Sequence, residues 1–260
     1  MAKIKAVDAA DYIEPGTSLR ILVAWFVSGF STFILTILTY GIGLIVALVA
    51  SIIYMILYYI RQSIAEANIK GSALRVGPKQ FPDIYEMAED IAESLDIDLP
   101  DVYILESNTQ NAFAIKHGGK RFVILVDDVI HGCQMTQNMD TLRFILAREM
   151  AHHALGHTTL IRSRLRAVYK PLSRLDELSC DAVAAAVVGK EAAADALTLL
   201  LVGPHLYSQV NRPSLERQSI QVEESKYTKK AERPSTHPLL LRRLARMIPD
   251  DESEAEVVDD

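Results

Sequence analysis

The pattern of apolar and polar residues separates one long uncharged segment from the rest of the chain. Residues 21–60 contain no charged residue and no histidine. A single helix over this segment would be roughly 60 Å long, about twice the thickness of the hydrocarbon core of a bilayer. Gly41 and Gly43 lie in its middle, where paired glycines allow a helix to turn back. We therefore predict two helices, near residues 20–39 and 43–61, that form a transmembrane hairpin with a very short turn.

A signal peptide and a buried core hairpin are the alternatives to a membrane segment. A signal peptide is shorter than this stretch, and no small-residue cleavage site follows it. A core hairpin normally carries polar residues on its outer faces. We therefore expect the segment to lie in a lipid bilayer.

Basic residues flank the predicted hairpin on both sides, and its turn is uncharged. These residues are Lys3, Lys5, Arg20, Arg61, Lys70, Arg75 and Lys79. A hairpin places both flanks on one side of the membrane, and the positive-inside rule makes that side the cytoplasm. We expect a multi-pass protein of the cell inner (cytoplasmic) membrane, with its soluble domain facing the cytoplasm.

Beyond the hairpin, short periodic segments predict a mostly helical domain with a small sheet, an α+β fold. Helices are expected from Pro82, from Thr141 to Thr158 with Asp140 as the cap, and near residues 173–188, 190–206 and 238–248. Strands are expected at residues 102–105, 112–115 and 122–126, the last two as a hairpin. The polar stretch 208–235 predicts a long mobile loop over the cleft.

These patterns divide the chain into five parts. They are an N-terminal segment (1–19), the hairpin (20–61), a linker that begins as a helical continuation (62–79), a domain (80–249) and an acidic tail that we expect to be disordered (250–260). The net charge of −6 does not indicate nucleic acid binding, and we expect none. Two cysteines, Cys133 and Cys180, are too few for a disulfide framework.

The helix expected from Thr141 contains Arg148-Glu149-Met150-Ala151-His152. Zinc peptidases use His-Glu-x-x-His on a helix, because residues four apart share one face and can hold one metal ion. The glutamate of that motif acts as the general base on metal-bound water. Glu149 and His152 fit this pattern, whereas Arg148 stands at the position of the first histidine.

Further residues of the same kind follow downstream. Glu177-x-x-x-Asp181 could supply a third metal ligand and, one turn later, a carboxylate that orients a ligand. His237 precedes Pro238, and Arg243 follows in the last predicted helix. Taken singly, each has an ordinary structural explanation, such as a buried hydrogen-bonded pair or a helix cap.

The order of these motifs resembles that of the membrane zinc metallopeptidase family of HtpX and the CAAX prenyl endopeptidases. The resemblance implies a zincin-like fold, one zinc ion on His152 and Glu177, and Glu149 as general base. Further implied roles are a supporting carboxylate (Asp181), transition-state stabilisation (His237, Arg243) and a substrate-binding strand (Asn111, Ala112, Phe113). Unlike HtpX, the chain has too few residues between His157 and Glu177 for a second membrane hairpin.

Arg148 places zinc binding in question. A guanidinium has no lone pair to offer, and at ~4 Å from a dication its charge costs about 8 kcal/mol at an effective dielectric of 20. Arg148 could instead pair with Glu149 or Glu177. On an ideal helix His152 lies about 40° from Arg148, whereas His153 and His157 lie about 140° and 180° away, so we expect both to point elsewhere. The Cys180 thiolate is a conceivable ligand, although a small packing residue is the commoner role.

Three functions therefore stay open. The first is a membrane-anchored zinc metalloendopeptidase-type protein that acts on membrane or misfolded proteins, with a compromised metal site and protein or peptide substrates. The second is a catalytically inactive pseudopeptidase that serves as a membrane-tethered protein-binding module. The third, a purely structural membrane scaffold, leaves Glu149 and Glu177 without a role.

Overall fold

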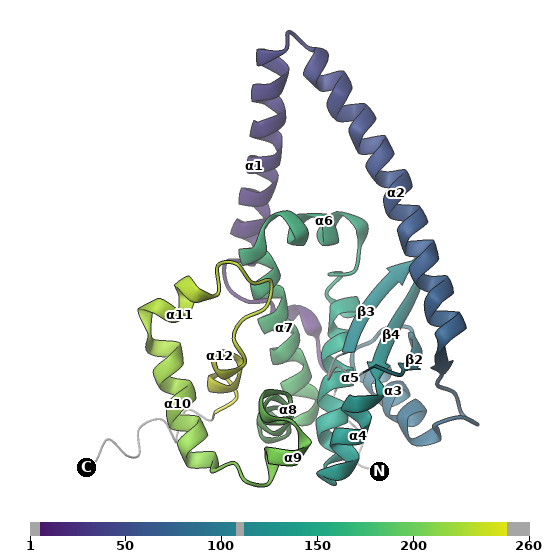
Figure 1. Ribbon diagram of the computed structural model, residues 1–260, viewed down its shortest axis with the longest axis vertical. Helices are drawn as coiled ribbons and strands as arrows, with labels where there is room; N and C mark the ends of the chain where they lie inside the picture. Colours follow the sequence, from purple (N-terminus) through teal and green to yellow (C-terminus); the bar gives the residue numbers. More distant parts are fainter. Residues whose placement is uncertain (1–5, 108–111, 249–260) are drawn as a thin grey trace.

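Two long apolar helices rise from a helical domain that contains one small sheet (Figure 1). The computed structural model describes residues 6–107 and 112–248. The longer helices are α1 (Thr17–Leu38), α2 (Ile42–Ser72), α3 (Pro82–Ser94), α4 (Asp127–Met135), α5 (Met139–Ala154), α6 (Leu160–Val168), α7 (Lys170–Val188), α8 (Lys190–Val202) and α10 (Arg212–Glu224). The short ones are the 3-10 helix η1 (Ala9–Tyr12), α9 (Pro204–Tyr207), α11 (Lys226–Ala231) and α12 (Leu240–Ala245). The strands are β1 (Ala73–Arg75), β2 (Asp101–Leu105), β3 (Ala112–His117) and β4 (Lys120–Val126). The predicted α+β class is confirmed.

Helices α1 and α2 form the predicted hairpin. Each is long and apolar enough to cross a membrane, with mean hydropathies of 2.2 and 2.4 over their most apolar windows, and both are largely unburied by the rest of the chain. The turn falls where the glycine pair predicts it, with Tyr40 and Gly41 at φ 49° and 89°. Tyr40 is 98% exposed at the tip. The two helices meet at this turn and diverge toward the domain (Figure 1).

The sheet has the strand order β1-β2-β4-β3, with β2 and β4 parallel and the other pairs antiparallel. Strand β4 is buried on both faces, and successive residues alternate between them. Val123 and Leu125 join the main core, whereas Phe122 and Ile124 pack with Ile69 of α2. Helix α2 therefore continues beyond its apolar part and covers the outer face of the sheet.

Helix α5 is the centre of the domain and is buried along most of its length. It packs against α7, α8, α3, α4 and strands β3 and β4. A helix surrounded in this way buries polar residues along with apolar ones, and each such polar group needs a partner. Helices α5 and α7 thus bring the candidate site residues together inside the domain.

Two predicted irregular segments are helical or extended in the structure. The expected linker at residues 62–79 is a continuation of α2 to Ser72 followed by strand β1, which pairs with β2. The expected loop at residues 208–235 contains α10 and α11, so the loop prediction is wrong. The Asn211 side chain caps α10 by accepting a hydrogen bond from the Ser214 amide, and the buried Leu215 anchors the helix to the core.

Smaller differences concern element ends. Asn138, not Asp140, caps α5 by accepting from the Thr141 amide. The helix expected at residues 190–206 is divided at Gly203 (φ 75°), before Pro204. Helices α4 and α6 and strand β1 were not predicted. The predicted acidic tail, and Asn111, lie outside the described residues.

Candidate active site and metal centre

The residues that the motifs single out border one cavity of about 440 Å³. Helix α5 supplies Arg148, Glu149 and His152, and α7 supplies Glu177. The other lining residues that matter below are Ala112, Phe113 and Ala114 of β3, Arg166 of α6, His237 and Arg243. The cavity therefore joins the centre of the domain to the end strand of the sheet.

Arg148 lies among three carboxylates. Its guanidinium donates to Glu149 Oε1 (2.5 Å), to Glu177 Oε2 and, through Nε, to Asp181 Oδ1 (3.1 Å). All three carboxylates are almost fully buried, and the Arg148 side chain is 12% exposed. The sequence left open whether Arg148 pairs with Glu149 or with Glu177. In the structure it pairs with both.

The two candidate histidines lie at the same carboxylate but at longer range. His152 Nε2 is 3.7 Å and His237 Nε2 is 3.6 Å from Glu177 Oε1. Arg166 donates to that same oxygen at 2.7 Å. Glu177 is therefore the point at which α5, α6, α7 and the segment before α12 converge.

Asp181 contacts arginines. Arg243 donates to it through Nε and Nη2, both at 2.7 Å, in the bidentate geometry that favours an arginine–carboxylate pair. Both side chains are buried. The imidazole partner that the sequence suggested for Asp181 is replaced here by Arg148 and Arg243.

Burial and neighbouring charges shift the pKa values of Glu149 and Glu177 in opposite directions. Burial raises the pKa of Glu149 to about 7, although Arg148 opposes the shift. Burial would also raise the pKa of Glu177, but Arg148, His152 and other neighbours outweigh it and hold that pKa well below its usual range. Burial disfavours the charged form of Arg148, yet the surrounding carboxylates raise its pKa further. Arg148 and Glu177 are thus a charged pair, whereas the Glu149 carboxyl gains or loses its proton near pH 7.

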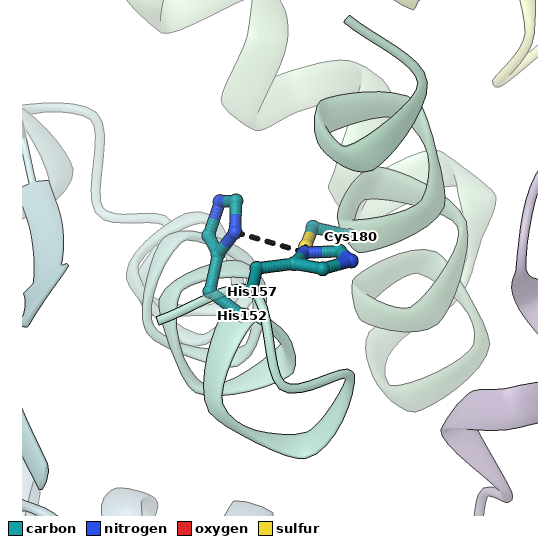
Figure 2. A group of neighbouring side chains, drawn as sticks. All are labelled: His152, His157 and Cys180. Carbon is teal, nitrogen blue, oxygen red and sulfur yellow. Dashed lines mark hydrogen bonds between the residues drawn. The ribbon is translucent and has the colours of Figure 1, made fainter. Parts of the chain in front are cut away.

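His157 does not line the cavity, as predicted, but it lies closer to His152 than the helical angle indicated. Helix α5 ends at Ala154, and Gly156 adopts φ 70°, which turns the chain back. His157 Nδ1 thereby lies 3.2 Å from His152 Nδ1 and 3.4 Å from Cys180 Sγ (Figure 2). The angle expected for His157 assumed that the helix continues to Thr158. Because α5 ends at Ala154, that angle does not apply to His157.

His153 fulfils the expectation that it points elsewhere. Its Nε2 is 3.0 Å from the carbonyl oxygen of Phe122, and its Nδ1 is 3.0 Å from Thr158 Oγ1. These contacts tie α5 to strand β4. Burial lowers its pKa to about 4, which fits a neutral structural imidazole.

Comparison with known proteins agrees with this architecture. Residues 78–168 match the model of peptidase family M48. Over these residues the chain is similar to this family. Protease HtpX homologs of Streptococcus gordonii and Streptococcus pyogenes serotype M3 are 26% and 29% identical over 110 and 113 residues. These alignments cover 42% and 44% of this chain but 36% and 37% of the relatives, so the chain matches little more than a third of their length.

M48 peptidases depend on zinc, and His152 and Glu177 are the residues at which the family resemblance places it, with Glu149 beside them as the general base. In this chain the guanidinium of Arg148 lies between Glu149 and Glu177 and donates to both. Arg148, Arg162, Arg166 and Arg243 also balance four buried carboxylates, Glu149, Asp176, Glu177 and Asp181. A dication at this place would add uncompensated charge beside Arg148. The residues present do not fit a zinc ion there.

Three residues that belong to this site, Asp176, Arg162 and Arg166, were not found from the sequence. Asp176 is fully buried beside Glu177 and binds Arg162 and Arg166 of α6. Arg162 and Arg166 are four apart, so one face of a helix at residues 160–168 would have been a detectable signal. Cys180 was considered as a ligand, but its contact with His157 depends on the turn after α5.

Proposed function

We propose that this protein is a membrane-anchored metallopeptidase-type protein that binds segments of membrane or misfolded proteins, with a peptidase metal site compromised by Arg148. The observation that supports this proposal is the position of the guanidinium, which donates to both Glu149 and Glu177. A base already hydrogen-bonded to a fixed cation is a poor proton acceptor. The alternative is a pseudopeptidase, a membrane-tethered binding module without turnover. The Arg148 geometry favours that alternative for the chain as written.

The cavity supports binding of an extended peptide. Strand β3 is an end strand in the order β1-β2-β4-β3, and Ala112, Phe113 and Ala114 line the cavity. An extended segment can add to the edge of a sheet, with its side chains entering neighbouring pockets. In this proposal Asn111, Ala112 and Phe113 hold the peptide backbone, and His237 and Arg243 border its central residue. His237 is 59% exposed at this border, whereas Arg243 is buried against Asp181.

The test of this proposal is the substitution Arg148→His. It removes the cation between the glutamates and leaves the helix intact, since both residues are compatible with helices. We expect zinc-dependent cleavage of an unfolded protein such as casein by Arg148→His, and none by the unmodified chain. Arg148→His combined with Glu149→Gln should bind zinc and not cleave, because the general base is absent.

Two results would contradict parts of the proposal. Cleavage of casein by the unmodified protein would show that Arg148 does not compromise the site. An inert Arg148→His variant that binds zinc and still binds casein would show that the domain is a binding module irrespective of Arg148. Cleavage is read by proteolysis, and zinc binding by the variants is read as zinc in excess of that held by the unmodified protein, so metal bound elsewhere in the chain does not affect the comparison.

A further inference from the structure

A second group of metal-ligand side chains lies behind the cavity, on the far edge of the His152 ring. His157 Nδ1 lies 3.2 Å from His152 Nδ1 and 3.4 Å from Cys180 Sγ. One ligand atom from each of these three buried residues lies within 4.8 Å of the other two. Figure 2 shows the two imidazoles and the thiol converging from α5, from the turn after it, and from α7. None of these three donor atoms is the Nε2 edge of His152 that faces Glu177.

The carboxylates next to the two rings determine which nitrogen carries the proton. Asp176 Oδ1 lies 3.5 Å from His157 Nε2, and Glu177 Oε1 lies 3.7 Å from His152 Nε2. A carboxylate favours a proton on the nitrogen that faces it, as in carboxylate–histidine–metal arrangements. Both neutral rings then present the lone pair of Nδ1 to the same place, at a separation of 3.2 Å.

Two facing lone pairs repel each other unless a proton or a cation lies between them. A hydrogen bond between the rings would require one of them to turn a lone pair toward its carboxylate. The Cys180 thiol can donate only one proton, and its sulfur lies 3.4 Å from His157 Nδ1. A cation shared by the three atoms satisfies both rings and the sulfur at once.

The spacing suits tetrahedral coordination. With Zn–N bonds of about 2.0–2.1 Å and a Zn–S bond of about 2.3 Å, a tetrahedral ion separates two nitrogens by about 3.3 Å and a nitrogen from a sulfur by about 3.6 Å. The corresponding distances here are 3.2 Å and 3.4 Å. Small shifts of the side chains therefore suffice to coordinate the metal.

We infer that His152, His157 and Cys180 form a metal site for a thiolate-preferring ion of the Zn²⁺ type, separate from the peptidase site. Imidazole and thiolate are ligands that Zn²⁺ prefers, and the thiolate offsets one of its two charges. The ion would fasten the turn after α5 to helix α7. It would act as a structural clip, and it does not depend on the proposed peptide-binding function.

The experiment is metal analysis of the purified full-length protein in detergent. Substitution of Cys180 tests the site, and the same substitution of Cys133 is the control. Cys133 and Cys180 are both fully buried, but only Cys180 belongs to the cluster. We expect about one zinc ion per chain in the unmodified protein and in Cys133→Ala. Cys180→Ala should weaken zinc binding by at least about 100-fold, because it removes a direct ligand.

Cobalt provides a readout that does not require the Cys180 variant to fold. Co²⁺ added to the metal-free unmodified protein or to Cys133→Ala should give the near-ultraviolet absorption of a thiolate–cobalt bond. Glu149→Gln should keep both the zinc and this absorption, since Glu149 is not a ligand of the proposed site. Absence of zinc together with absence of the cobalt–thiolate band would overturn the inference, as would full zinc retention by Cys180→Ala.

Discussion

At the scale of residues, Arg148 is the main determinant of the candidate site. A buried guanidinium loses its hydration, and it is stable here because Glu149, Glu177 and Asp181 surround it. The same three carboxylates without Arg148 would be buried like charges. The guanidinium of Arg148 therefore supplies positive charge to this cluster of carboxylates, as a bound zinc ion would.

We expect Arg148→Met to destabilise the protein by about 3–5 kcal/mol. The substitution leaves the buried Glu149 without its arginine, and it leaves Glu177 only Arg166 and Asp181 only Arg243. Arg143→Met is a matched control on the same helix, since the ion pair of Arg143 with Asp90 (3.3 Å) is more exposed. That control should cost no more than about 1 kcal/mol. Denaturant unfolding in detergent, followed by circular dichroism, compares the two variants. Equal losses would show that the Arg148 network does not stabilise the fold.

The sequence located several site residues from spacing alone. Glu149, His152 and Glu177 are brought to one cavity, as expected for positions on two facing helices. Their proposed roles remain predictions. The positions of His157 and Cys180 could not be obtained, because they depend on where α5 ends and on the positive φ of Gly156. The end of a helix is decided by local turns and by packing, which periodicity does not report.

At the scale of elements, helix α6 links the site to the membrane helices. Its inner face carries Arg162 and Arg166, which hold Asp176 and Glu177. Its outer residues Leu160, Ile161 and Val168 are 40%, 60% and 68% exposed. A short helix with an exposed apolar face is unusual on a water-facing surface.

The neighbours of α6 place it at the level of the apolar membrane segments. Leu165 of α6 packs with Ala24 of α1, and Arg164 lies over the ring of Tyr54 of α2, 4.5 Å from its centroid. Ala24 and Tyr54 both lie inside the uncharged stretch 21–60. Figure 1 shows α6 between the lower parts of the two helices. We therefore expect its outer face to contact lipid at the membrane interface.

Fluorescence quenching tests this expectation in reconstituted vesicles of the full chain. The native cysteines are fully buried, so a fluorophore can be attached to Ile161→Cys or Val168→Cys. We expect quenching by spin-labelled lipids at both positions, and little by aqueous iodide. Tyr227→Cys is the control, because Tyr227 is 76% exposed on α11 and should respond to iodide. The reverse pattern at position 161 or 168 would place α6 in water.

Element types were predicted best where the pattern was strong. The hairpin, strands β2–β4 and helices α3, α5, α7 and α8 follow from apolar runs, alternation and helical spacing. Helices α10 and α11 were missed because few of their residues are apolar. Helix α10 is held by packing against α12 and by Arg242, which binds Glu223 and Glu232. Ion pairs between distant segments leave no periodic signal in the sequence.

At the scale of the whole molecule, the domain touches both ends of the hairpin. Before α1, the Glu14 amide donates to Ser179 Oγ at 2.9 Å, and Val7 pairs with Ser94 through the backbone at 2.8 Å. After α2, the chain enters strand β1 of the sheet. We therefore expect both ends of the hairpin to lie on the side of the membrane that holds the domain, and the turn at Tyr40 to lie on the other side. This argument is independent of the flanking charges.

The remaining question is which side holds the domain, and the basic flanks predict that it is the cytoplasmic side. Cysteine labelling with a membrane-impermeant maleimide decides it, since the buried native cysteines give the unmodified chain a low background. In right-side-out vesicles we expect Tyr40→Cys to react, because Tyr40 is 98% exposed at the tip of the hairpin. Tyr227→Cys on the domain should react only after the vesicles are opened or inverted. Labelling of both positions from one side would contradict the hairpin, whereas the exchanged pattern would keep the hairpin and reverse its orientation. The positive-inside rule predicts the first arrangement because basic loops are retained on the cytoplasmic side, and the uncharged turn is the part that crosses most readily.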